Sequence, residues 1–282
     1  MTCPRNGYTD ARFGQLHYME ARPERAPGRA NARTLILLHQ NPSSSEEYRH
    51  LLTEMARDRR VVAFDTPGFG MSARPDRPLA IADYAAAFAE GMAAMGLDEP
   101  VDLFGFHTGT LLAVELAALL GTQARHIVLS GIPFRPEPER VERLAQIHAV
   151  QPPTDDGEAI FARLRWLWQF TVAERTPGIP VERAAQIWAE RAKPLHRYWW
   201  PYAGVWTYPI EERFAAVTQP VLVVQPPETL LEHSKAAARL IPDARVVELP
   251  HMIRDIFEPE GGVADIALAL RQFFDEDQTN AA

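Results

Sequence analysis

Short apolar runs alternate along this chain with longer segments of helical periodicity. The run Thr-Leu-Ile-Leu-Leu at residues 34–38 has no polar side chain facing water, which indicates a strand buried on both faces. Similar runs occupy residues 60–65, 101–104, 126–130, 221–224 and 245–249. Helical segments between them include residues 43–57, 81–95, 111–118, 230–240 and 262–274. This alternation predicts an α/β protein with a mostly parallel sheet.

Two stretches depart from this alternation. Residues 12–21 alternate polar and apolar positions, which predicts an early antiparallel strand or one half of a hairpin. After Ile132 the chain contains three prolines and then helical segments from about residue 141 to 215. We therefore predict a core domain of residues 1–133 and 216–282, interrupted by a helical cap of residues 134–215.

The start of the helix at residues 43–57 has a recognisable signature. Ser44 and Glu47 have the spacing of a capping box, in which each side chain bonds to the other residue's backbone N–H. We expect this pair to begin the helix.

Composition excludes some classes of partner. The chain has 282 residues and a formal net charge of −8, which disfavours a nucleic-acid partner because phosphates attract basic surfaces. Cys3 is the single cysteine, so a reducing compartment is expected. No secretory signal or run of about 20 apolar residues is visible. We expect a soluble cytoplasmic protein with no membrane partner, and infer no oligomeric state.

The most informative segment is Gly105-Phe106-His107-Thr108-Gly109, which follows an apolar strand and opens a helical run. Strand, Gly-x-nucleophile-x-Gly and helix is the layout of a nucleophile elbow, a turn that holds one side chain exposed at a sheet edge. Here a histidine occupies the nucleophile position. The scaffold is therefore recognisable, whereas the chemistry needs separate argument.

Four segments in order resemble the α/β-hydrolase superfamily, in its branch with a helical cap. They are His39-Gln40-Asn41-Pro42, the turn at residues 65–72 (Asp-Thr-Pro-Gly-Phe-Gly-Met-Ser), the elbow, and His251 after the last strand. The resemblance implies an eight-stranded, mostly parallel sheet flanked by helices, with the cap after the sixth strand. It also implies that His251 is the catalytic base and that residues 39–42 form the oxyanion loop.

The chain departs from the family pattern at several positions. Gln40 stands where glycine is usual, and the family's acid position falls at Thr229, with Glu228 one residue earlier. A second acid position used in the family falls at Gly131. A complete Ser-His-acid triad is therefore absent. We expect Glu228 to orient His251, with Asp255 as a weaker substitute.

The remaining parts still predict acyl chemistry. The backbone amides of Asn41 and Thr108 should form an oxyanion hole, in which each donor contributes about 2.7–4 kcal/mol. His107 and His251 should face the same cavity, and imidazole changes charge near neutral pH. His107 could attack a carbonyl to form an acyl-imidazole, or either histidine could deprotonate a water molecule; we favour the water route.

Other functions are compatible with the same residues. The two histidines could transfer protons without hydrolysis, as in a lyase, isomerase or cyclase. The chain could also be a ligand-binding pseudoenzyme that retains only the pocket. We expect no cofactor and no metal; His39, His107 and His251 would be the ligands if a metal were bound, although His39 is better explained as a structural residue.

Aromatic residues of the cap suggest the character of the substrate. Trp199 and Trp200 belong to a dense aromatic cluster, and we expect them to line the pocket together with Gln40 and Phe106. A small apolar carbonyl compound would suit this lining. The cap arginines (Arg163, Arg165, Arg191 and Arg197) are expected to be solvated rather than substrate-binding.

Overall fold

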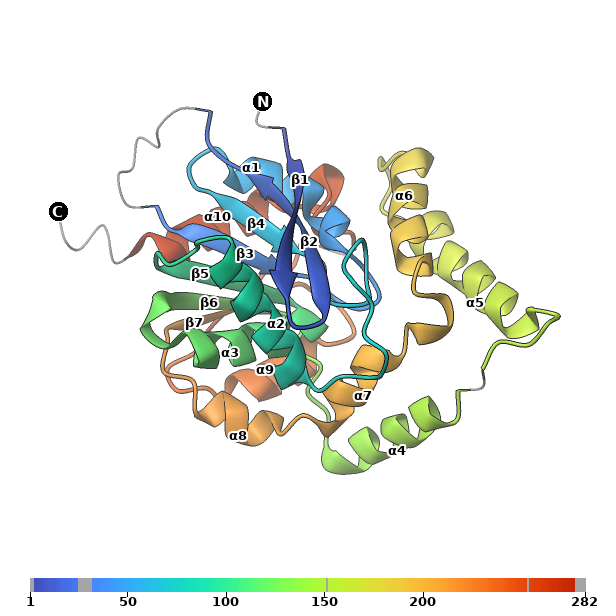
Figure 1. Ribbon diagram of the computed structural model, residues 1–282. Coiled ribbons are helices and arrows are strands. Elements are labelled where there is room, and N and C mark those ends of the chain that lie inside the picture. Colours follow the sequence, from blue (N-terminus) through green and yellow to red (C-terminus); the bar gives the residue numbers. More distant parts are fainter. Residues whose placement is uncertain (1–2, 25–31, 151, 253, 277–282) are drawn as a thin grey trace.

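The apolar runs form the strands of a single sheet. The computed structural model describes residues 3–24, 32–150, 152–252 and 254–276. Its eight strands lie in the order β1-β2-β4-β3-β5-β6-β7-β8 (Figure 1). They are β1 (Arg5–Ala11), β2 (Gly14–Ala21), β3 (Thr34–Leu38), β4 (Val61–Phe64), β5 (Val101–Phe106), β6 (Ala124–Ser130), β7 (Val221–Gln225) and β8 (Arg245–Glu248). Pairs β1–β2 and β2–β4 are antiparallel and the rest are parallel, so the predicted sheet is confirmed.

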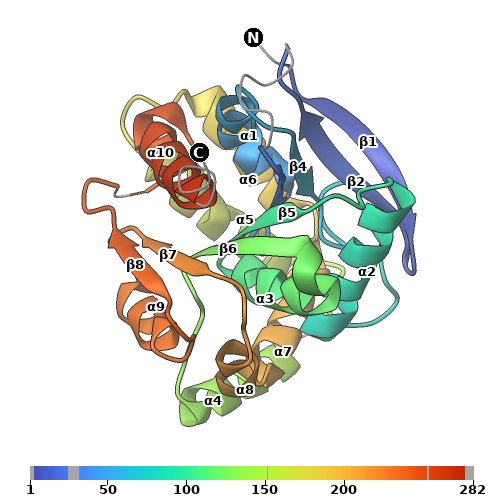
Figure 2. The same ribbon diagram turned by 90° about the vertical axis from the view of Figure 1, so that its left-hand side faces the viewer.

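Helices cover both faces of this sheet. Helices α2 (Ile81–Ala94) and α3 (Thr108–Leu120) lie on one face, and α1 (Arg49–Met55) and α10 (Val263–Phe274) on the other (Figure 2). Strand side chains alternate between the two resulting cores, because successive residues of a strand point to opposite faces. Ile36 of β3 packs in the core beneath α2 and α3, whereas Leu37 packs in the core beneath α1 and α10.

The N-terminal strands form a hairpin. β2 coincides with most of the predicted alternating segment, and β1 pairs with it from Arg5 opposite Glu20 to Ala11 opposite Gly14. The sequence pattern did not indicate β1, because its residues are mostly exposed or half-buried and have no apolar periodicity.

The predicted capping box between Ser44 and Glu47 is only partly confirmed. A 3₁₀ turn, η1 (Ser45–Tyr48), precedes α1, and Ser44 Oγ accepts a hydrogen bond from the Glu46 N–H at 3.3 Å. Glu47 does not return to the cap; its carboxylate is buried and accepts hydrogen bonds from Gln40 and Ser43. Tertiary contacts with the loop after β3 therefore replace the local bond.

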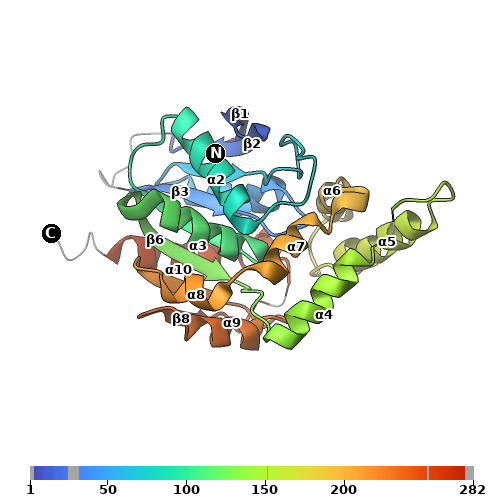
Figure 3. The ribbon, with the colours of Figure 1, turned by 60° about the horizontal axis from the view of Figure 1, so that its bottom comes forward.

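The chain between β6 and β7 is helical, with no strand among its described residues. It contains α4 (Glu137–His148), α5 (Glu158–Trp168), the π-helical turn η3 (Gln169–Ala173), α6 (Val181–Ala192), α7 (Trp200–Thr207) and α8 (Ile210–Ala215). Helices α4 and α5 extend away from the sheet (Figures 1 and 3). By contrast, Val205, Ile210 and Phe214 join the core beneath α2 and α3. We keep 134–215 as the proposed cap.

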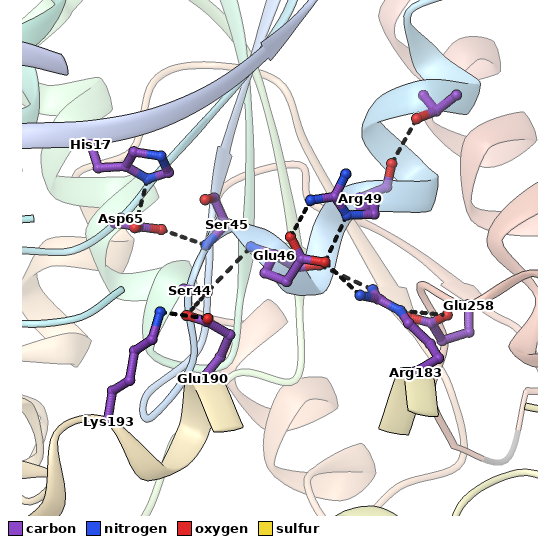
Figure 4. A network of polar contacts seen from close by, with 11 residues as sticks. His17, Ser44, Ser45, Glu46, Arg49, Asp65, Arg183, Glu190, Lys193 and Glu258 are labelled. Carbon is purple, nitrogen blue, oxygen red and sulfur yellow. Dashed lines mark hydrogen bonds and ion pairs between the residues drawn. The ribbon is translucent and has the colours of Figure 1, made fainter. Parts of the chain in front are cut away.

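Helix α6 is attached to the core at both ends (Figure 4). Near its start, Arg183 bonds Glu46 of η1 at 2.6 Å and Glu258, in the segment before α10, at 2.7 Å. Near its end, Glu190 accepts a hydrogen bond from Ser44 Oγ at 2.9 Å. These contacts fix the face of α6 that looks toward the sheet. None of the helices in the described ranges is long and apolar enough to cross a membrane.

Candidate active site

The elbow has the expected backbone. β5 ends immediately before His107, which has a φ of +48°, and α3 begins at Thr108. A Cβ at Gly105 would lie 2.2 Å from the carbonyl oxygen of Gly109, and one at Gly109 would lie 2.0 Å from that of Leu38. Both positions therefore require glycine, because the start of α3 is pressed against the ends of β5 and β3.

The His107 ring is bonded to a carboxylate from another strand. Nε2 of His107 lies 2.8 Å from Oε2 of Glu228, which follows β7. A carboxylate accepts hydrogen bonds, so Nε2 carries a proton, and in the neutral imidazole Nδ1 keeps its lone pair. No partner for Nδ1 occurs among the residues described. The Phe106 ring packs against the imidazole with centroids 4.1 Å apart, which fixes the plane of the ring.

The pair occupies space that a glycine leaves free. In β6, Ser130 is the partner of Phe106, so the next residues, Gly131 and His107, are neighbours. A Cβ at Gly131 would lie 2.2 Å from Cδ2 of His107 and 2.5 Å from Oε1 of Glu228. Gly131 is one of the two family acid positions, and here its missing side chain makes room for the imidazole.

Gln225 connects the surroundings of the pair. Its Oε1 accepts a hydrogen bond from the Gly131 N–H at 3.2 Å, and its Nε2 lies 3.4 Å from Oε1 of Glu228. The Gln225 side chain is buried at the end of β7. It therefore holds the ends of β6 and β7 in register around the carboxylate.

His251 does not meet His107, which corrects the prediction that both rings face one cavity. Its side chain is exposed, and His251 is not among the described residues that line the cavity. The next residue, Met252, is buried and its N–H bonds to the Leu249 carbonyl, so this tight turn points His251 outward. Glu228 is bonded to His107, so the expectation that it orients His251 is also wrong.

The loop after β3 is held by side chains from the core and from α7. Both the backbone N–H and the side-chain amide of Gln40 donate to Glu47, at 3.1 and 2.9 Å. The hydroxyl of Tyr202 in α7 donates to the carbonyl of Asn41. Burial raises the pKa of Tyr202 to about 12, so this hydroxyl stays protonated at neutral pH.

The predicted oxyanion donors belong to two buried segments that lie close together. Across the described chain, the backbone N–H groups of Asn41 and Thr108 have no acceptor within the protein. Both residues are buried, and the side-chain amide of Asn41 also has no bonding partner. The contact of Gly109 with Leu38 brings the two segments together. The oxyanion hole remains a prediction that these contacts favour.

A cavity of about 410 Å³ opens beside the pair. Residues from three regions line it: Gln40, Glu47, Phe106 and His107; Phe170, Ile187 and Arg191; and Pro226 to Thr229 and Arg254 to Glu258. Gln40 and Phe106 therefore lie in the cavity wall, and their contact with a substrate stays a prediction. The aromatic rings in the wall are Phe106, Phe170 and Phe257, which give the cavity an apolar side.

The prediction that Trp199 and Trp200 line this cavity is wrong. Neither residue belongs to its wall as far as the structure describes it. Both are half-buried at the start of α7, where their rings contact each other edge to face at a centroid distance of 6.3 Å. Their density in the sequence reflects packing of the cap's own aromatic residues.

Arg191 of α6 is a site residue that the sequence analysis placed in solvent. It lines the cavity, and its Nε is buried without an acceptor. Burial lowers the pKa of Arg191, although the charges of Glu47 and Asp255 oppose this. Its position four residues after Ile187, another wall residue, was the available signal, because residues four apart share a helix face.

His39 has a structural role, as its sequence position suggested. Its Nε2 accepts a hydrogen bond from the Thr66 N–H at 2.9 Å, and its Nδ1 donates to the Gln40 carbonyl at 2.6 Å. Both ring nitrogens are therefore occupied. The described residues contain no group of three or more histidine, cysteine or acidic side chains that could hold a metal ion.

Comparisons with known proteins agree on the fold. A family model described as alpha/beta hydrolase fold matches residues 33–191. The enol-lactonase of Burkholderia xenovorans is 19% identical, with a TM-score of 0.75 over 96% of this chain and 100% of that one. An esterase of Thermogutta terrifontis is 18% identical, with a TM-score of 0.70 over 96% and 98% of the two chains.

A third structure carries a different name. The bromoperoxidase of Bacillus anthracis is 16% identical, with a TM-score of 0.71 over 96% of this chain and 100% of that one. A curated relative, the nonribosomal peptide synthetase agiA of Aspergillus flavus, is 32% identical over 88 residues, or 31% of this chain. The chain spans about 1% of that relative's length. These likenesses establish an architecture shared by several chemistries.

Proposed function

Since this chain belongs to the alpha/beta hydrolase fold family, whose model matches more than half of it, we propose that it hydrolyses an acyl bond. The substrate would be an ester, lactone or related carbonyl compound with an apolar body. The observation that carries the proposal is the 2.8 Å contact between His107 Nε2 and Glu228 at the cavity wall. In this reading, His107 on the elbow and Glu228 after β7 together replace the family's serine and its separate base.

The proposed reaction starts at the free nitrogen of the ring. Glu228 accepts a hydrogen bond from the Nε2–H group of His107, which leaves the lone pair on Nδ1. Nδ1 then accepts a proton from a water molecule. The water oxygen bonds to the substrate carbonyl carbon, and the carbonyl electrons move to its oxygen. The N–H groups of Asn41 and Thr108 would stabilise that oxyanion.

The second half of the reaction restores the histidine. The carbonyl re-forms, the bond to the leaving oxygen breaks, and the imidazolium donates its proton to that oxygen. The products are a carboxylic acid and an alcohol, or one hydroxy acid from a lactone. We favour this route over an acyl-imidazole, because the ring occupies the space through which a small nucleophile would approach the carbonyl.

The alternative of a lyase, isomerase or cyclase that uses both His107 and His251 is less well supported. A lyase or isomerase of that kind needs a second base across the cavity, and His251 is exposed instead. A ligand-binding pseudoenzyme is distinguished from the proposed hydrolase by turnover alone.

The test is a panel of aryl esters and lactones assayed with variants of the pair. We expect His107→Ala to lower kcat/KM by about 10²–10⁴-fold, the usual contribution of a general base. Glu228→Gln should lower kcat/KM by about 10–100-fold, because a neutral amide oxygen accepts a weaker hydrogen bond from Nε2–H than a carboxylate does. His148→Ala, on the exposed face of α4, is the matched control and should leave kcat/KM unchanged.

Two results would contradict the proposal. One is wild-type turnover that survives in His107→Ala. The other is hydrolysis that is absent from the wild type and gained only in His107→Ser, which would indicate a site that has lost its reaction.

A further inference from the structure

One charged group in the cavity wall, Arg191, has few hydrogen-bond partners among the described residues. A guanidinium has five N–H donors. In the described structure, Arg191 makes a single hydrogen bond, from Nη1 to Thr171 Oγ1 at 3.3 Å, which is long for such a bond. Its Nε is buried with no acceptor. Burying donors without acceptors costs free energy, so this arrangement requires an explanation.

The other charged groups of the same wall are occupied. Arg254 donates to Glu174 at 3.1 Å and to the Phe170 carbonyl. Glu47 accepts hydrogen bonds from Gln40 and Ser43. Asp255 likewise accepts a hydrogen bond from the Thr176 N–H at 2.8 Å.

No ion pair joins Arg191 to Glu47 or Asp255 within the described residues, although their charges act on it. Arg191 is therefore a cation in the wall whose Nη2 donates no hydrogen bond within the described residues.

The position of Arg191 is fixed from outside the cavity. Helix α6 is attached near its start by Arg183 to Glu46 and Glu258, and near its end by Glu190 to Ser44 (Figure 4). Because Arg191 directly follows Glu190, its backbone cannot move away without breaking that contact. The backbone that carries the guanidinium is thus held in place, which reduces part of the entropy lost when a ligand binds.

We propose that Arg191 binds a carboxylate group of the substrate, so that the substrates are small organic acids with an apolar body. The planar guanidinium matches a carboxylate through two parallel N–H···O bonds. The apolar body would lie against Phe106, Phe257 and Ile187, with the scissile carbonyl toward His107. A singly charged group suits the site better than a phosphate, because Glu47 and Asp255 would repel a second negative charge.

The carbonyl placement rests on the proposed function, whereas carboxylate binding does not. Binding is therefore measured directly, by isothermal titration calorimetry with benzoate, its neutral isostere benzamide, and phenyl phosphate. We expect the wild type to bind benzoate about tenfold or more tightly than benzamide, the usual size of a hydrogen bond to a charged group. Arg191→Met should lose this preference, and Arg191→Lys should recover only part of it.

Arg165→Ala is the matched control, because Arg165 is an exposed arginine of α5 outside the cavity wall. This variant should keep the full preference for benzoate. A preference that survives in Arg191→Met, or that is absent from the wild type, would overturn the proposal. Tighter binding of phenyl phosphate than of benzoate would overturn the carboxylate assignment.

A stability measurement separates ligand binding from a structural role. If Arg191 serves a ligand, Arg191→Met should raise the melting temperature, because it removes a buried cation with unused donors. If Arg191 instead neutralises Glu47 and Asp255 for folding, the same change should lower the melting temperature, and the proposal fails.

The two proposals also fail separately. His107→Ala should retain the preference for benzoate while losing hydrolysis. Selective carboxylate binding without turnover in the wild type would overturn the proposed hydrolysis and leave the carboxylate site standing.

Discussion

His107 and His251 both follow the carboxyl ends of parallel strands, yet their environments differ. His107 comes after β5, a central strand whose residues are all buried, and it is bonded to Glu228. His251 comes shortly after β8, an edge strand whose four residues are all exposed, and its ring faces solvent. A motif position therefore indicates where a side chain can be, while the neighbouring strands decide what it contacts.

The difference begins in the backbone around each histidine. Interstrand pairs fix the elbow on both sides: β5 is hydrogen-bonded to β3 and to β6. The turn after β8 has only one neighbouring strand, and burial of Met252 sets its orientation. Central position thus gives His107 a defined partner, and edge position leaves His251 without one among the described residues.

Outside the His107–Glu228 pair itself, the largest expected effect comes from filling the space beside His107. Gly131→Ala would place a methyl group 2.2 Å from the imidazole and 2.5 Å from the Glu228 carboxylate. We expect the ring to be displaced by about 1 Å and kcat/KM for the best ester of the panel to fall by about a hundredfold.

Gly96→Ala controls for backbone strain. Gly96 has a φ of +64°, close to the +69° of Gly131, but an added Cβ there meets nothing within 4 Å. Both variants should lose about 1–2 kcal/mol of stability from forcing alanine into the left-handed region. Gly131→Ala should lose more, because its added Cβ also overlaps the imidazole and the carboxylate. Equal activity of the two variants would show that the His107–Glu228 pair has no part in turnover.

An intermediate effect, on the free energy of unfolding as a function of pH, is expected from changing Glu258 in the segment that follows His251. Glu258 of that segment is bonded to Arg183 and to His50. Burial alone would raise the pKa of Glu258, but the hydrogen bonds and charges of His50 and Arg183 outweigh burial and lower it.

A carboxylate with a lowered folded-state pKa stabilises the fold above its unfolded pKa, about 4.3, and this contribution is lost as the pH falls through the folded value. We therefore expect Glu258→Gln to destabilise the protein by about 1.5–3 kcal/mol at pH 7. The difference from wild type should shrink below about pH 4, as urea unfolding between pH 3 and 7 would measure. A difference that is constant with pH would exclude this role.

The smallest effect is expected at the other histidine. His251→Ala removes an exposed ring, so stability should change by less than about 0.5 kcal/mol and kcat/KM by less than about twofold. Kinetics on the same ester panel would measure this. A loss comparable to that of His107→Ala would mean that the turn after β8 rearranges to bring His251 into the cavity during catalysis.

The sequence by itself determined the strands other than β1, the helices between them and the elbow. Continuous apolar runs such as residues 34–38 can only be buried on both faces, and their alternation with helices leaves few arrangements of a parallel sheet. The glycines around His107 likewise specify a tight strand-to-helix turn, because close backbone contacts exclude any side chain there. These are local properties that a short window of sequence contains.

Only the tertiary structure decided which side chains meet. His107 and Glu228 are 121 residues apart, and no local pattern joins them; the register of β5, β6 and β7 does. Arg191 has an ordinary sequence context, and only the attachment of α6 to the core places it in the cavity wall. Contacts of this kind depend on how whole elements pack, so their energies cannot be assigned from the residues on either side in the chain.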